Sequence, residues 1–310
     1  MTTTVQSPLK RKKPINWSRT LFIISHITLP WLFWLVFYVY VNIRGFTLAF
    51  EDAATGEFTL KHFIRFWEEI KSPTGELNEA LRNTLITFAI SFIRMPFQVL
   101  VPYFIYKKIP LSGTWQFLFY IPNMIFGMAM TMVFTQLMGT RGFIAQQIGE
   151  WMGLNYVPEL LADSRFANYL VWAHMLWVGF PGDLIIWGGT FARIPAEVLE
   201  SGQLDGVNWI QEFTLITLPL VWPTFALKML LSVCGLLSAS GAVFLLTNGD
   251  FGTQTLPVWL FQQSLAGVGN PESPVFNYMS AVGIVMTIFS VSLTFVVRKF
   301  TNKAFAGVEY

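Results

Sequence analysis

Long apolar stretches separated by short polar segments dominate the chain. Six of them have the roughly 20 residues that a helix needs to cross a hydrocarbon core of about 30 Å. They lie near residues 20–43, 84–106, 115–138, 167–190, 218–246 and 275–297. The first is too long for a secretory signal peptide, and no small-residue cleavage site follows it. This pattern predicts an all-α integral membrane protein with six transmembrane helices.

The polar segments indicate one membrane domain with two tails. We expect a basic N-terminal tail over 1–19, a single transmembrane domain over 20–300 and a short tail over 301–310. The polar segment 191–217 joins helices 4 and 5. No internal repeat of the kind found in many secondary transporters is evident.

Composition agrees with a membrane protein. Of 310 residues, 54% are hydrophobic and only 12% charged, against about 25% charged in an average soluble domain. Cys234 is the single cysteine, which excludes an internal disulfide, and His26, His62 and His174 lie too far apart for a metal site. No basic stripe with interleaved aromatic residues indicates nucleic-acid binding.

The positions of the basic residues predict the orientation, because cytoplasmic loops are enriched in Lys and Arg. With the N-terminus inside, the cytoplasmic side receives Lys10, Arg11, Lys12, Lys13, Arg19, Lys107, Lys108, Arg193, Arg298, Lys299 and Lys303. The outer side receives fewer, over longer loops: Arg44, Lys61, Arg65, Lys71, Arg82, Arg141 and Arg165. Both termini and the 191–217 loop are then cytoplasmic.

The first outer loop is acidic and contains an amphipathic segment. Its apolar residues at helical spacing are Leu60, Phe63, Ile64 and Trp67. Two interpretations stay open: a helix that lies on the outer membrane surface or against a partner, and a solvated helix that caps the bundle.

The chain lacks the residues that would make it an enzyme. No Gly-Lys dipeptide occurs, so no phosphate-binding loop is present, and any ATP must be hydrolysed by another polypeptide. A serine-protease interpretation of Ser238 to Gly241 fails because no His follows His174. We expect His174 to be a hydrogen-bonded interior residue.

The 191–217 loop has the residues of two short helices. Pro195 suits the first turn of a helix, where Glu197 meets the positive end of the helix dipole. Gly206 fits a helix stop in the left-handed region. A second helix from Trp209 to Ile216 returns the chain to the membrane. The prediction is a helix–Gly–helix protrusion that faces the cytosol.

The spacing within this loop resembles the signature of bacterial ABC-importer permeases, which is E-A-A, three residues, G, nine residues and I-x-L-P. Glu200-Ser201-Gly202, Gly206 and Ile216-Thr217-Leu218-Pro219 keep this spacing, with small residues in place of both alanines. The resemblance implies that the following residues form a coupling helix and its return to the membrane, which dock on an ATPase: Glu197, Glu200, Ser201, Gly202, Asp205, Gly206, Ile216 and Pro219.

Further segments resemble the carbohydrate-uptake group of these permeases. Asn83-Thr84-Leu85 is similar to its N-T-L entry to a span, and Ile121-Pro122-Asn123 and Gly142-Phe143-Ile144 are similar to other landmarks. Leu246-Thr247-Asn248-Gly249 is similar to the L-T-N-G of the maltose-transporter F type, although Asp250 and Phe251 replace the Gly and Pro that follow there. We therefore favour an F-type half of a heterodimeric pair.

The resemblance also implies the partners and the location. These are a second permease of the G type, two ATPases that bind ATP and Mg, an external solute-binding protein and the lipid of a bacterial plasma (inner) membrane. No cofactor is expected in this chain. The resemblance implies import of a sugar or oligosaccharide by alternating access. The alternatives are a permease of the same architecture for a non-sugar solute, such as a peptide or polyamine, and an ion-coupled transporter or channel that works alone.

Ionisable residues within spans are costly and mark functional or structural sites. Arg94 lies in the middle of the second span, Asp183 in the fourth and Lys228 low in the fifth. Lys228 has the length to reach the cytoplasmic interface. We expect Arg94 inside the bundle with Asp183 as its candidate partner, and favour a structural ion pair over a substrate contact.

Candidate pathway residues are the polar, aromatic and small residues of spans 3 to 5. Sugar sites combine aromatic and hydrogen-bonding groups, but small and aromatic residues also serve helix packing and membrane interfaces. The candidates are Asn123, Met124, Met128, Trp172, Trp177, Gly179, Gly182, Gly235, Ser238 and Ser240.

Overall fold

A computed structural model of the chain describes residues 17–153, 159–179, 183–237, 241–268 and 273–304. Within these ranges the protein consists of helices and connecting turns, and the one β-bridge there joins Glu51 to Phe58. The predicted all-helical membrane class is confirmed at this level.

Four helical segments in the described ranges are long and apolar enough to cross a membrane: Leu21–Ala49, Glu76–Tyr106, Trp209–Leu237 and Pro274–Ala304. The first comprises α1 (Trp17–Trp34), a π-helical stretch (Leu35–Tyr40) and α2 (Val41–Ala49). The second is α4 (Glu76–Tyr106) and the last is α15 (Pro274–Ala304). The third comprises α11 (Trp209–Gln211), the π-helical η4 (Glu212–Thr217), α12 (Leu218–Cys234) and the 3-10 turn η5 (Gly235–Leu237).

Two further spans are present if each of two bent helix pairs counts as one. The first pair combines α5 (Ser112–Met124) with α6 (Gly127–Met138) and α7 (Phe143–Trp151), at a bend of 93°. The second combines α8 (Ala167–Gly179) with α9 (Leu184–Phe191), at 41°. The predicted stretch 218–246 is also divided, because α13 (Gly241–Thr247) is a separate helix that packs against α8.

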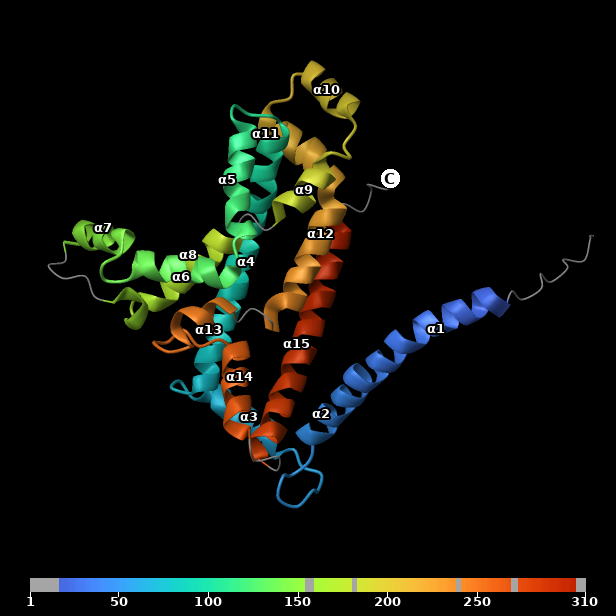
Figure 1. The fold of residues 1–310 in the computed structure, drawn as a ribbon, viewed down its shortest axis with the longest axis vertical. Helices are drawn as coiled ribbons and strands as arrows, with labels where there is room; N and C mark the ends of the chain where they lie inside the picture. The colour runs from blue at the N-terminus through green and yellow to red at the C-terminus, as the bar shows by residue number, and fades with distance from the viewer. Residues whose placement is uncertain (1–16, 154–158, 180–182, 238–240, 269–272, 305–310) are drawn as a thin grey trace, which may run out of the picture.

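The remaining helices lie at the two ends of the bundle (Figure 1). We call one end the α10 end, because α10 (Ala196–Leu204) protrudes there beside the C-terminal part of α15. The opposite α3 end carries α3 (Lys61–Lys71) and α14 (Leu256–Gly267). A 3-10 turn, Leu160–Ala162, precedes α8.

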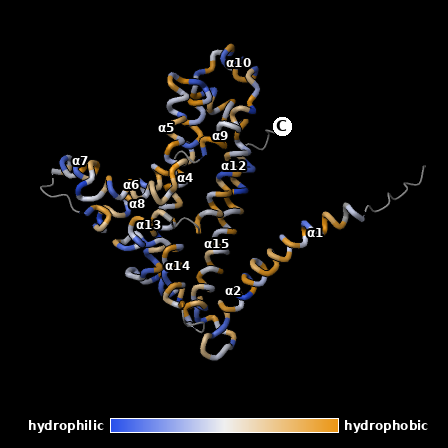
Figure 2. The backbone as a smooth tube through the Cα atoms, in the orientation of Figure 1, coloured by the Kyte–Doolittle hydropathy of each residue, from blue (hydrophilic) through white to orange (hydrophobic). Residues whose placement is uncertain are grey.

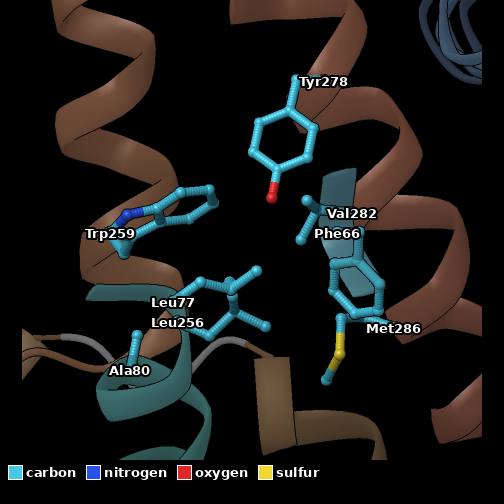
Figure 3. Packing of buried hydrophobic residues seen from close by; sticks show 8 residues of the cluster. All are labelled: Phe66, Leu77, Ala80, Leu256, Trp259, Tyr278, Val282 and Met286. Carbon is cyan, nitrogen blue, oxygen red and sulfur yellow. The ribbon is translucent and has the colours of Figure 1, made fainter. Parts of the chain in front are cut away.

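The α3 end contains a buried apolar cluster. It joins α3, α4, α14 and α15 and consists of Phe66, Leu77, Ala80, Leu256, Trp259, Tyr278, Val282 and Met286 (Figure 3). Phe66 is the residue by which α3 enters this cluster, whereas Leu60, Ile64 and Trp67 are exposed. The helix thus caps the bundle through a face adjacent to the one that the sequence pattern emphasises.

The first span lies largely apart from the rest of the bundle (Figure 1). Every side chain from Leu21 to Tyr38 is exposed, although the segment is strongly apolar (Figure 2). Contact with the bundle comes from α2, which packs along α15. At that junction Asn277 donates hydrogen bonds to the carbonyls of Leu48 (3.1 Å) and Glu51 (2.7 Å).

Candidate functional site

The α10 end contains the motif that the sequence singles out. Helix α10 begins directly after Pro195, places Glu197 in its first turn and ends before Gly206. Gly206 has φ = +76°. Its N–H donates to the Gln203 carbonyl (3.1 Å), and the Val207 N–H donates to the Gly202 carbonyl (3.2 Å). This is the bonding pattern of a Schellman helix stop, which needs a residue in the left-handed region.

The two halves of the motif are in contact. Leu199 and Gly202 form the buried face of α10. A Cβ added to Gly202 would lie 2.7 Å from Ile216 Cδ1. The spacing between the small residues and the I-x-L-P segment therefore has a direct structural reason, since Ile216 packs on the site where α10 has no side chain.

The outward face of α10 is accessible. Glu197, Glu200, Ser201 and Asp205 are all exposed, as is Leu204 at 89%. Leu204 was not among the predicted docking residues, although its position at the last turn before a helix-stopping glycine was visible in the sequence. Val198 is also exposed.

The return to the membrane is a continuous helix. Asn208 caps its start: the Asn208 side chain accepts from the Gln211 N–H (3.0 Å), and the Gln211 side chain accepts from the Asn208 N–H (2.9 Å). Pro219 lies in the first turn of α12, where the helix tolerates a missing N–H because the π-helical η4 precedes it. An apolar cluster anchors the whole protrusion on α4, α9 and α12: Val99, Tyr103, Trp187, Phe191, Ile194, Leu199 and Val221.

A second polar site lies inside the bundle, where α8 ends. Two side chains of α4 donate to its last carbonyls: Arg94 Nη1 to Met175 (3.0 Å) and Gln98 Nε2 to Gly179 (2.9 Å). A positive charge and an amide donor suit the unpaired carbonyls at a helix C-terminus. Gly179 contacts the guanidinium so closely that an added Cβ would collide with it.

Asp183 does not pair with Arg94 in a hydrogen-bonded ion pair. It lies at the start of α9 and accepts a hydrogen bond from Lys228 Nζ of α12 at 2.5 Å, with 15% and 23% of the two side chains exposed. The direct partner of Asp183 is thus Lys228, while Arg94 interacts with Asp183 through the electrostatic attraction of their charges. Arg94 and Gln98 thus bind the end of α8, and Lys228 binds the start of α9, so polar side chains hold both halves of the fourth span.

The remaining predicted pathway residues do not line one common cavity in the described structure. Met124 and Met128 lie at the α5–α6 bend and are 79% and 45% exposed. Trp177 borders an open apolar hollow of about 560 Å³ between α5 and α8, with Trp115 and Leu176. Gly235 borders a small enclosed cavity with Thr87, Ser91 and Ser232. Trp172 is half-buried. Gly182, Ser238, Ser240 and the Asn123 side chain lie outside the described residues.

His174 is an interior residue, as expected. Its ring is buried in α8, with Nε2 3.3 Å from the hydroxyl of Thr131. In the described part of the chain no three His, Cys, Asp or Glu side chains gather as metal ligands would.

The N-T-L and L-T-N-G segments meet at the α3 end. Asn83 donates to the carbonyls of Gly252 (2.8 Å) and Gln254 (3.0 Å), and Thr84 accepts from the Leu256 N–H (2.8 Å). Asn168 donates to the same Gly252 carbonyl (2.7 Å). The turn after Thr247 contains four residues with positive φ, namely Asn248, Gly249, Phe251 and Gly252. The N-T-L segment thus binds the turn that directly follows the L-T-N-G segment.

Gly142, another landmark, is sterically required. It precedes α7, and an added Cβ would collide with the backbone carbonyls of Gln136 and Leu137 at the end of α6. Because backbone atoms cannot move aside as a flexible side chain does, we expect Gly142→Ala to destabilise the protein by about 2 kcal/mol.

Thermal unfolding in detergent measures this effect. Gly127→Ala is the matched control, because nothing lies within 4 Å of a Cβ there and alanine favours the helix. Equal melting temperatures for the two variants would contradict the steric account of Gly142.

Known proteins that are similar to this chain include permease proteins of sugar transport systems. No protein-family model matches the chain. The chain is 21% identical over 256 residues to the multiple sugar-binding transport system permease protein MsmF of Streptococcus mutans, covering 81% of this chain and 82% of that protein. It is 25% identical over 312 residues to the lactose transport system permease protein LacF of Rhizobium radiobacter, covering 95% and 97%.

A solved structure shares the fold. It is a bacterial ABC transporter involved in the import of the acidic polysaccharide alginate, with a TM-score of 0.76 at 18% identity over 93% of this chain and 98% of that chain. This chain therefore shares its helical fold with a chain of an ABC importer, and the relatives that it is similar to are permease proteins of sugar transport systems. Its homologues confirm the predicted resemblance to the carbohydrate-uptake family of these permeases.

Proposed function

We propose that this chain forms half of the pathway by which an ABC importer takes up a sugar or oligosaccharide. The observation that carries the proposal is α10, an exposed acidic helix that a left-handed glycine stops and that Ile216 holds in place. In this proposal α10 docks on one of two cytoplasmic ATPases, which bind ATP and Mg, while this chain is not itself catalytic.

The α10 end would then face the cytosol of a bacterium, with six spans in the plasma membrane. The bent pairs α5–α6 and α8–α9 are two of these spans. The orientation rests on the basic residues near the α10 end, including Lys107, Arg193 and Arg298, since cytoplasmic loops are rich in Lys and Arg. Both termini are cytoplasmic in this arrangement.

The uncovered first span supports a second permease as partner. Every side chain from Leu21 to Tyr38 is exposed, so this helix gains little packing stabilisation from the rest of its own chain. Helices associate in membranes by packing against one another, so a neighbouring subunit supplies the surface that α1 lacks. We propose a different chain of the G type, with this chain as the F type, on the basis of the L-T-N-G segment at Leu246 to Gly249.

An external solute-binding protein would deliver the substrate at the α3 end. A second structure of the alginate transporter, in complex with alginate pentasaccharide-bound periplasmic protein, has the same fold as this chain, with a TM-score of 0.72. Transport follows by alternating access: closure of the ATPase pair shifts α10, and the linked spans open toward the binding protein. Binding free energy that differs between the two states couples the sites.

Reconstitution tests the proposal. The chain is co-expressed with its neighbouring permease and ATPase genes, purified as a complex and placed in proteoliposomes with the sugar-loaded binding protein. We expect sugar uptake and ATP hydrolysis that the loaded binding protein stimulates. Peptide or polyamine uptake under the same conditions would favour a non-sugar permease, and uptake by this chain without any ATPase would favour an ion-coupled transporter.

A further inference from the structure

A buried ion pair lies directly behind α10. Among the residues that the structure describes, Glu212 is the one buried carboxylate, with 3% of the residue exposed. Both of its oxygens accept hydrogen bonds from Lys107 Nζ at 2.7 Å, and Oε1 also accepts one from the Tyr103 hydroxyl at 3.1 Å. The carboxylate therefore accepts three hydrogen bonds from two donor groups, one in the last turn of α4 and one on the residue that follows this helix.

The partners come from two separate parts of the chain. Tyr103 is in the last turn of α4, and Lys107 directly follows that helix. Glu212 opens η4, on the segment that returns from α10 to the membrane. In sequence the contact spans 105 residues, and it is the ionic link between this return segment and α4 within the described residues.

Apolar packing surrounds the Lys107–Glu212 pair, but it fixes the position of the return segment relative to α4 less specifically than the ion pair does. Tyr103, Phe191, Leu199 and Val221 belong to one cluster that holds α10, α4 and α9 together. Such contacts are non-directional. A buried carboxylate is different, because separating it from its donors leaves an unpaired charge out of water.

Helix α4 extends from this site to the far end of the bundle. It runs from Glu76 to Tyr106, and at the α3 end Asn83 and Thr84 bind the turn that precedes α14. When the return segment moves, Glu212 moves with it. Because Glu212 is bonded to the end of α4, the displacement would be transmitted through α4 to the opposite membrane surface.

We propose that Lys107 and Glu212, with Tyr103, are positioning residues that make α4 move with α10, so that ATPase docking drives the outer end of the pathway. This inference rests on the proposed function and assigns coupling to a specific contact. It predicts that losing the pair uncouples ATP hydrolysis from transport while docking of α10 on the ATPase persists, because the exposed face of α10 is unchanged.

The experiment uses the complete reconstituted complex and compares Lys107→Met, the double variant Lys107→Met/Glu212→Met and the charge swap Lys107→Glu/Glu212→Lys. Melting temperature, ATPase co-purification, ATP hydrolysis and substrate uptake are measured for each. Lys107→Met should lower the melting temperature, since it leaves Glu212 unpaired. The double variant should restore part of the melting temperature, because apolar replacements of a buried pair are tolerated while the buried Tyr103 hydroxyl loses its acceptor.

The ratio of substrate imported to ATP hydrolysed separates positioning from stability. We expect this ratio to fall by about tenfold or more in the double variant and to recover in the charge swap. Lys108→Met is the matched control, because Lys108 is the neighbouring lysine, is exposed and has no ion pair among the described contacts. Its ratio should equal that of the wild type.

Two outcomes distinguish failure of this inference from failure of the proposed function. If the wild-type complex shows no uptake coupled to ATP hydrolysis, the proposed function fails. If the wild type is coupled and the folded double variant keeps the wild-type ratio, the ion pair is structural only and the inference is overturned. Loss of ATPase co-purification in the double variant would also overturn it, since the defect would then be in docking.

Discussion

Replacing Gly206 with valine should weaken ATPase docking by roughly tenfold or more and reduce uptake accordingly, while leaving the protein inserted in the membrane. Gly206 has φ = +76°, and nothing lies within 4 Å of a Cβ at this position, so the effect comes from the backbone alone. A β-branched residue in this region costs about 1 to 3 kcal/mol, which the chain can avoid by giving up the helix stop. The end of α10 would then turn away from its docking orientation.

Co-purification with the ATPase and stimulated ATP hydrolysis measure this result. A cost of this size corresponds to a loss of roughly tenfold or more in ATPase affinity. Gly202→Ala is the control on the same helix: its Cβ meets only the end of the Ile216 side chain, at 2.7 Å, which can move aside. We expect that variant to retain near-normal uptake. Normal uptake by Gly206→Val would contradict the role assigned to α10.

Replacing Lys228 with methionine should destabilise the protein more than any surface charge substitution. The variant removes the Lys228 ammonium group that donates to Asp183 at 2.5 Å, and only 15% of the Asp183 side chain is exposed. Breaking a buried pair costs about 3 to 5 kcal/mol, and the partial exposure of Lys228 favours the lower end of this range. Asp183→Asn should cost less, because the long Lys228 side chain can extend toward the interface.

Thermal unfolding in detergent checks both variants together with the double variant Lys228→Met/Asp183→Asn. The double variant should recover most of the lost stability, since no charge is left unpaired. Lys61→Met is the control, because the Lys61–Asp52 pair is a surface contact in which 77% of the lysine side chain is exposed. This substitution should change the free energy of unfolding by less than about 1 kcal/mol. Equal melting temperatures for Lys228→Met and Lys61→Met would mean that the intramembrane pair contributes little.

The role of Arg94 follows from the same part of the fold. Its guanidinium donates to the Met175 carbonyl, beside Gly179, and Gln98 donates to the Gly179 carbonyl at the end of α8. These contacts favour a structural function over a substrate contact, because the polar group is already used to satisfy backbone that a broken membrane helix leaves unpaired. The hydrogen bonds thus explain why a charge is retained in the middle of a span.

The sequence by itself determined the all-helical membrane class, the approximate positions of the apolar helices and the helix–Gly–helix loop. Hydropathy depends on local composition, so the membrane class and the approximate spans followed from single stretches of chain. The helix stop at Gly206 and its short companion helix depend on residues within a few positions of each other, which is why they were predictable. The resemblance in spacing from Glu200 to Pro219 then led to the permease family that the homologues support.

Only the tertiary structure decided where the helices break and which polar side chains meet. A hydropathy window averages over a break because the residues on both sides stay apolar, so the bend of 93° between α5 and α6 and the separation of α12 from α13 were not visible. Pairing of Asp183 with Lys228, and of Glu212 with Lys107, depends on the rotation and depth of helices that lie far apart in the sequence. Those quantities are set by packing of the whole bundle, which no local pattern encodes.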